Sequence, residues 1–163
     1  MKLRLLLPFL LISAAQADVA TDVVIEQPFA RAAIQQQRNS AAFMTITNPG
    51  ADAQIVAASS PVAEVVELHT HINDNGVMRM RKIEKIDLPS AQAVMLKPGG
   101  LHVMLLGLNR DLNIGEQIDV TLEFSDGSRK QLQVPVQKVV RPAMKHMSGQ
   151  KMHDGSMPMK MSH

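Results

Sequence analysis

The chain has 163 residues, of which 45% are apolar and 20% are charged, as expected for a single globular domain with a sizeable core. Seventeen basic residues against fifteen acidic ones, and no Trp or Tyr, provide neither the basic surface nor the stacking platform that nucleic-acid binding requires. The absence of cysteine excludes disulfides, thiolate metal ligands and a lipid anchor on Cys.

The first seventeen residues have the pattern of a secretory signal peptide. Lys2 and Arg4 precede an apolar run at residues 5–12, and an Ala-Gln-Ala motif ending at Ala17 offers small residues to a signal peptidase. The run is too short to span a bilayer, and no second apolar stretch of about 18 residues follows. We expect cleavage after Ala17, a mature chain that begins at Asp18 and is not inserted in a membrane, and a periplasmic location.

Residues 18–140 alternate short β-prone runs with turns rich in Asn, Gly, Pro and Asp. Met44 and Met95 lie in apolar runs without a nearby His and are predicted to pack in the core. A single turn of helix could occupy residues 109–115. This pattern predicts an all-β domain, an antiparallel Greek-key sandwich or barrel. The nine predicted strands are residues 23–25, 42–47, 54–57, 65–72, 77–83, 93–97, 101–108, 117–124 and 130–136.

Two of these strands carry paired histidines and methionines. His69 and His71 share one face because side chains two apart in a strand point the same way, and Met78 and Met80 do so on the next strand. A four-residue turn at residues 73–76 would pair His71 with Met78 and His69 with Met80. A two-residue turn would pair His71 with Met80 and leave His69 diagonal to it. Either register places all four side chains on one face, so both remain open.

His102 and Met104 share a face of the strand at residues 101–108, whose other face is apolar. With His69 and Met80 they form the spacing His, ten residues, Met, twenty-one residues, His, one residue, Met. Imidazoles with thioethers suit copper, Cu(I) in particular, and are poor ligands for magnesium or calcium. These four residues are the predicted Cu(I) site, provided that the two strand pairs converge. The nearby pair of His71 and Met78 could add ligands, support the ligands, or be ordinary surface residues.

The composition changes abruptly in residues 144–163, which hold six of the twelve Met and three of the six His. Few branched apolar residues are available there for burial, so we predict a flexible tail at residues 141–163, after a folded domain at residues 18–140. Exposed methionines gain no burial energy and are prone to oxidation, and copper capture explains them better than a plain linker. The predicted tail ligands are Met144, Met147, Met152, Met157, Met159 and Met161 for Cu(I), and His146, His153 and His163 for Cu(II).

These motifs resemble the PCu(A)C family of periplasmic copper chaperones. The segments that carry the resemblance are AAFMTITN (41–48), VELHTH (66–71), NGVMRMR (75–81) and LKPGGLHVML (96–105). One departure is Thr70, where the family signature often has Met directly after the first His; in a regular strand Thr70 faces away from that His. The resemblance implies a cupredoxin-like β-sandwich that binds Cu(I) near its surface. It also implies delivery of Cu(I) to the copper-bearing subunit of cytochrome c oxidase, alongside a thioredoxin-like Sco protein.

Other functions fit the sequence less well. We find no catalytic constellation, and we therefore do not expect an enzyme. The alternative is a periplasmic copper buffer or resistance protein without a dedicated acceptor, which the tail favours. An electron-transfer cupredoxin requires a Cys thiolate, which is absent. A copper oxygenase with an N-terminal histidine brace is disfavoured because the predicted mature terminus is Asp18.

Overall fold

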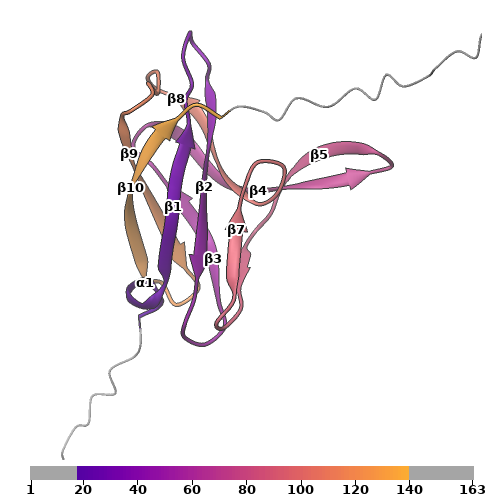
Figure 1. Ribbon diagram of the computed structural model, residues 1–163, viewed down its shortest axis with the longest axis vertical. Helices are drawn as coiled ribbons and strands as arrows, with labels where there is room; N and C mark the ends of the chain where they lie inside the picture. Colours follow the sequence, from indigo (N-terminus) through magenta and orange to yellow (C-terminus); the bar gives the residue numbers. More distant parts are fainter. Residues whose placement is uncertain (1–17, 140–163) are drawn as a thin grey trace, which may run out of the picture.

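The structure is a computed structural model, and it describes residues 18–139 (Figure 1). The predicted signal peptide and the predicted Met- and His-rich tail lie outside this range. No helix among the described residues is long and apolar enough to cross a membrane. The elements in chain order are α1 (Val19–Asp22), β1 (Val24–Arg31), β2 (Asn39–Thr47), β3 (Ala53–Ser59), β4 (Ala63–Asp74), β5 (Val77–Lys82), β6 (Ile86–Leu88), β7 (Ala93–Leu96), β8 (His102–Leu108), β9 (Gln117–Phe124) and β10 (Arg129–Gln137).

The strands form one open hydrogen-bonded path in the order β5-β4-β8-β2-β1-β10-β9-β3-β6, with β7 paired to β2. Every pairing between these strands is antiparallel except the short parallel contact of β1 with β10, where the path turns from one layer to the other. The all-β, cupredoxin-like prediction is confirmed. The parallel link is a detail that strand patterns alone do not reveal, because β1 and β10 lie at opposite ends of the domain sequence.

A single core lies between the two layers. Alternate residues of β9, from Ile118 to Phe124, are buried, whereas their neighbours face solvent in part. Val103 and Leu105 of β8 enter the same core from the opposite layer. Each fully buried Leu, Ile or Val side chain contributes roughly 1.5–3 kcal/mol relative to an exposed one. This alternation fixes the register of each strand, because a shift by one residue would turn its buried side chains toward solvent.

The strand predictions failed mainly at short or irregular elements. Strand β6 was missed because it has three residues and follows two charged ones, which is too short a run to show alternation. Strand β1 continues to Arg31, beyond its predicted end at residue 25. The prediction stopped early because a bulge between Glu26 and Phe29, with Gln27 at a φ of 49°, interrupts the regular strand pattern. Pro28 sits in that irregularity, where the missing N–H is tolerated.

Two smaller predictions about packing and helix were wrong. Met44 is buried as expected, but 56% of the Met95 surface is exposed. In the short strand β7 the side chain of Leu96 is buried, and that of its neighbour Met95 points to the other side, toward solvent. The segment at residues 109–115 holds no helical turn; Leu112 instead forms an isolated bridge with Ala33. The apolar run at residues 93–97 does not show whether the protein covers one face of the strand or both.

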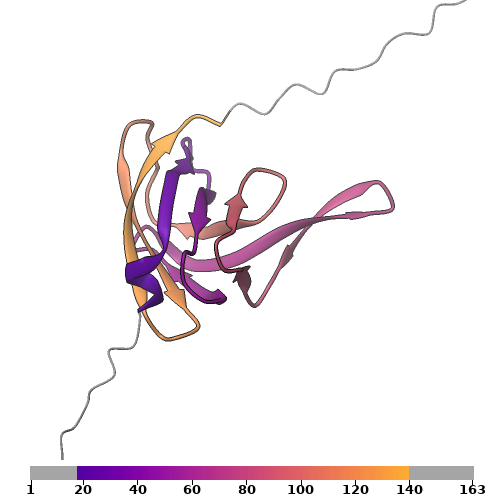
Figure 2. The same ribbon diagram turned by 60° about the horizontal axis from the view of Figure 1, so that its bottom comes forward.

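The hairpin of β4 and β5 extends away from the body of the sandwich, as the two views in Figure 1 and Figure 2 agree. The half of β4 nearest the body pairs with β8, and the distal half pairs only with β5. All six residues of β5 are exposed. His69 lies at the base of this hairpin, where both β5 and β8 pair with β4.

Candidate copper site

The turn between β4 and β5 settles the register that the sequence left open. Asp74 pairs with Val77, so the turn has two residues, Asn75 and Gly76, and both have positive φ angles of 52° and 84°. A turn of this kind requires residues that tolerate the left-handed region, and Asn-Gly is the preferred pair. As a result Met80 lies opposite His71 rather than opposite His69.

Strand β8 brings the second half of the motif to the first. It runs antiparallel to β4 with His102 directly opposite His69 and Met104 directly opposite Glu67. These side chains share one face of three adjacent strands, because paired residues in a sheet point to the same side. We call this the histidine face, and it carries Glu67, His69, His71 and, on the neighbouring strands, Met78, Met80, Lys82, His102 and Met104.

Three imidazole rings cluster at the centre of the histidine face. The ring centroids of His69 and His102 are 5.7 Å apart, and those of His71 and His102 are 5.2 Å apart. Phe43 of β2 lies on the other side of His102, with its centroid 6.2 Å away. His102 is therefore enclosed by rings on both sides.

His102 is buried and has one unused ring nitrogen. Its Nδ1 lies 2.9 Å from the carbonyl oxygen of Gly100, so Nδ1 carries the hydrogen and donates it. Its Nε2 is buried and has no hydrogen-bond partner. Burial lowers the pKa of His102, the Gly100 hydrogen bond opposes that shift, and the nearby His71, His69 and Arg31 lower it further. The neutral ring with a free Nε2 lone pair is the form that binds a metal ion.

His69 has the opposite arrangement of its nitrogens. Its Nε2 lies 2.7 Å from Glu67 Oε2, while its Nδ1 is buried without a partner. The second oxygen of Glu67, Oε1, accepts a hydrogen bond from Lys82 Nζ at 2.8 Å. The Lys82 hydrogen bond, and then the one from His69, holds the pKa of Glu67 below its usual value. The carboxylate is thus ionised and acts as an acceptor toward His69.

The thioethers complete the histidine face at different depths. Met104 is partly buried opposite Glu67, and 44% of the Met80 surface is exposed. Met78 lies one step further along the hairpin, opposite Asn73, and is more exposed. No group of three or more His, Cys, Asp or Glu side chains in residues 18–139 is arranged to hold a metal ion. Met80 and Met104 are the predicted thioether ligands on the same face as the histidines.

The family of the chain follows from its match to known sequences. The family model described as "Putative lipoprotein LpqE-like" matches residues 23–136, which include every residue of the histidine face. The chain belongs to the LpqE-like family. A curated relative, "Putative lipoprotein Lxx21020" of Leifsonia xyli subsp. xyli, is 39% identical over 99 residues, which are 60% of this chain and 60% of that protein. The match thus spans less than two thirds of that relative's length.

Solved structures similar to this LpqE-like chain include PCuAC domains. The "Copper-bound PCuAC domain from PmoF2" has a TM-score of 0.62 at 21% identity, over 72% of this chain and 94% of that one, and shows the shared fold. The apo form of DR1885 from Deinococcus radiodurans has a TM-score of 0.59 at 30% identity, over 86% of this chain and 96% of that one. A second solution structure of DR1885 is of its Cu(I) form, with a TM-score of 0.56 at 30% identity, over 72% of this chain and 78% of that one.

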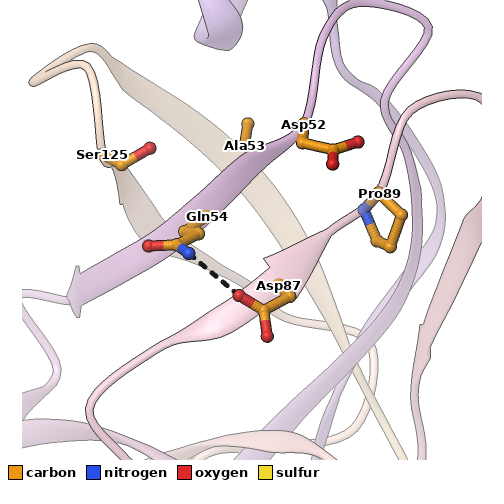
Figure 3. A pocket seen from close by; sticks show the side chains of 6 residues that line it. All are labelled: Asp52, Ala53, Gln54, Asp87, Pro89 and Ser125. Atoms are coloured by element: carbon orange, nitrogen blue, oxygen red, sulfur yellow. Dashed lines mark hydrogen bonds between the residues drawn. The ribbon is translucent and has the colours of Figure 1, made fainter.

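A surface hollow elsewhere on the LpqE-like domain does not contribute to the histidine face. It is lined by β3, β6 and the loop after β9, and Gln54 Nε2 donates a 3.0 Å hydrogen bond to Asp87 Oδ1 within it (Figure 3). None of its lining residues belongs to β4, β5 or β8. The histidine face lies instead on the sheet formed by β4, β5 and β8.

Sequence reasoning placed the predicted ligands of each strand pair on a shared face, but it missed two groups that contact the histidines and a third that contacts one of those groups. Glu67 contacts His69, the carbonyl of Gly100 contacts His102, and Lys82 contacts Glu67. Glu67 could have been found, since it lies two residues before His69 and must share its face. Lys82 follows only from the observed register, which places it opposite His69.

Proposed function

We propose that this protein is an exported copper carrier that binds Cu(I) through His69, Met80, His102 and Met104. It passes the ion by ligand exchange to the copper-bearing subunit of cytochrome c oxidase. No nucleophile or general base takes part in such a transfer, so the protein has no need of enzymatic activity. Copper is the cargo in this proposal, and the histidine face is its binding site.

The observation that carries the proposal is the pair of unused nitrogens on the histidine face. Nδ1 of His69 and Nε2 of His102 are buried without partners on residues that lie directly opposite each other. An unsatisfied buried polar atom costs roughly 1–3 kcal/mol, and such atoms are rare in native proteins unless they have a function. A bound ion that accepts both lone pairs explains why the cost is tolerated.

The choice of copper rests on the donor types and on the similar structures. Neutral imidazoles beside thioethers favour Cu(I) over the hard cations. Two of the similar structures, the PmoF2 domain and one form of DR1885, are of copper-bound proteins. The lipoprotein description of the family agrees with an exported protein, as does the signal-peptide pattern of residues 1–17.

Release follows from the order in which the ligands can be reached. Met80, on the projecting hairpin, is the most accessible of the four, and His102 is the least. A partner thiolate is anionic and a stronger Cu(I) ligand than a neutral thioether, so it displaces the methionines first and the histidines afterwards. The cysteine-free site thus gives up its ion to a cysteine-containing acceptor, directly or with the help of a thioredoxin-like Sco protein.

The test is a competition titration with a Cu(I) chelator on the double variant H102A/M104A. We expect the affinity of the folded site to fall more than about 100-fold, because even residues that only support metal ligands cost 10- to 100-fold when removed. The control I72A/V77A removes two exposed side chains of the β4–β5 hairpin that point away from the histidine face. Unchanged affinity in H102A/M104A would move the copper site elsewhere.

The Met- and His-rich composition of residues 144–163 favours a second candidate, a periplasmic buffer that sequesters copper. A variant that ends at residue 140 separates the two candidates. The carrier proposal expects this variant still to metallate a copper-bearing oxidase fragment, whereas the buffer proposal expects most of the copper capacity to disappear.

A further inference from the structure

The two facing histidines of the histidine face are held by acceptors of different kinds on different nitrogens. A carboxylate oxygen of Glu67 lies 2.7 Å from Nε2 of His69, whereas a backbone carbonyl, that of Gly100, lies 2.9 Å from Nδ1 of His102. The remaining nitrogen of each ring is buried and unpaired. The two rings therefore differ in which nitrogen is left without a hydrogen-bond partner.

The chemistry of a neutral imidazole turns this geometry into a tautomer assignment. One nitrogen carries the hydrogen and the other carries a lone pair. An ionised carboxylate and a carbonyl only accept hydrogen bonds, so each fixes the hydrogen on the nitrogen that it faces. In zinc sites and other metal sites, a carboxylate behind a histidine fixes the tautomer and strengthens the ligand in the same way.

From this geometry we infer that Glu67 is a positioning residue that sets the His69 tautomer, so that copper is bound by Nδ1 of His69 and by Nε2 of His102. This inference rests on the proposed function and names the atoms of that site. Glu67 does not bind the ion. It lies opposite Met104 on the neighbouring strand, close enough to the site to orient a ligand from the side away from the metal.

Lys82 supports this arrangement from the third strand. It pairs with His69 in the register of β4 and β5, and its Nζ lies 2.8 Å from Glu67 Oε1. Glu67 is mostly buried, with 20% of its side chain exposed, whereas Lys82 is 65% exposed. The ammonium group occupies one carboxylate oxygen and leaves the other for His69. A chain of contacts thus runs from Lys82 at the surface through Glu67 to the metal-binding ring.

The first experiment is imidazole ¹⁵N NMR on the metal-free full-length protein at a pH where the rings are neutral. In the native protein we expect the hydrogen of His69 on Nε2 and that of His102 on Nδ1. The variant E67L, which removes the acceptor, should shift His69 toward the other tautomer or a mixture and leave His102 unchanged. E67Q keeps an oxygen that can accept from Nε2 and should largely preserve the native tautomer.

Glu64 provides a matched control on the same strand. Its side chain is 68% exposed and faces Arg38 at 3.5 Å. E64L should leave both tautomers unchanged. A purely structural role for Glu67 would lower stability in E67L without moving the His69 tautomer, and that result would overturn the inference.

The second experiment adds Cu(I), which is diamagnetic and leaves the spectra readable. Binding should move the signals of Nδ1 of His69 and Nε2 of His102, with the hydrogen retained on the other nitrogen of each ring. Cu(I) affinity should fall about 10- to 100-fold in E67L, as for other residues that support metal ligands, and stay native in E64L. Coordination through Nε2 of His69, or native affinity in E67L, would refute the role of Glu67 and leave the proposed function standing. Failure of the proposed function itself would appear instead as unchanged Cu(I) affinity in H102A/M104A.

Discussion

Strand β8 buries side chains on both of its faces, and the two faces differ in chemistry. Val103 and Leu105 enter the core between the layers and are fully buried. His102, next to Val103 in the chain, is 2% exposed on the other face, among the rings of His69, His71 and Phe43. Apolar burial stabilises the first face, whereas the second face buries Nε2 of His102 without a partner. Burial at Val103 therefore stabilises the core, whereas burial at His102 is where we propose that a ligand nitrogen is held for copper.

The largest effect on stability should come from the apolar face. Leu105→Ala removes a fully buried side chain and should lower the free energy of unfolding by about 2–5 kcal/mol. The Cu(I) affinity should remain close to native. Urea denaturation followed by circular dichroism is suitable, because the chain has no Trp or Tyr. A cost below about 1 kcal/mol would show that β8 packs differently from the structure.

The histidine face should show a strong dependence on pH in its copper affinity. An imidazole must lose its proton to bind metal, and its free pKa is about 6.5, so Cu(I) affinity should be at least about tenfold weaker at pH 5 than at pH 7.5. Burial lowers the pKa of His102, so this ring stays available to lower pH than an exposed histidine would. Equal chelator competition at the two pH values would contradict histidine ligation.

Replacing the buried ring itself should have a smaller effect on stability. His102→Leu removes an unsatisfied buried nitrogen and the hydrogen bond to Gly100 together. The Gly100 carbonyl loses its donor, but Gly100 is only partly buried and His71 Nδ1 lies 3.5 Å from the same oxygen. We therefore expect a change of about 1 kcal/mol for the metal-free protein. Cu(I) binding at the folded site should be lost. A large destabilisation would mean that His102 is a structural residue.

The smallest effect is the contribution of His102 to the pH dependence of stability. Because burial lowers its pKa in the folded state, the unfolded state binds more protons below about pH 6.5. Stability from this group is complete above that pH and declines as the pH falls toward the folded-state pKa. The metal-free native protein should therefore lose more stability between pH 7.5 and pH 5 than H102L does. Parallel pH profiles in denaturant titrations would refute this.

The sequence predicts which side chains share a face of a strand better than it predicts which strands pair with one another. The period of two in β4, β5 and β8 places His69, His71, Met80, His102 and Met104 correctly on shared faces. It does not predict that β8 pairs with β4, because that contact joins strands separated by three others along the chain. The hairpin register also stays open until the backbone angles of the Asn-Gly turn are known.

Other errors arose where local pattern and tertiary packing disagree. Met95 lies in an apolar run, yet only one face of β7 is covered by the core. Glu67 looks like an ordinary solvated residue of an alternating strand, and its role depends on Lys82 and His69, which the register brings to it. The contacts of Glu67 with His69 and Lys82 depend on which strands pair and in which register, and composition and periodicity do not reveal this.

The most direct test of the central claim is a site-resolved NMR titration of the mature full-length protein with Cu(I), up to one equivalent. The account predicts that the rings of His69 and His102 and the methyl groups of Met80 and Met104 shift together, before those of His146, His153 and His163. Shifts confined to the residues after position 140, with the histidine face unchanged, would contradict it.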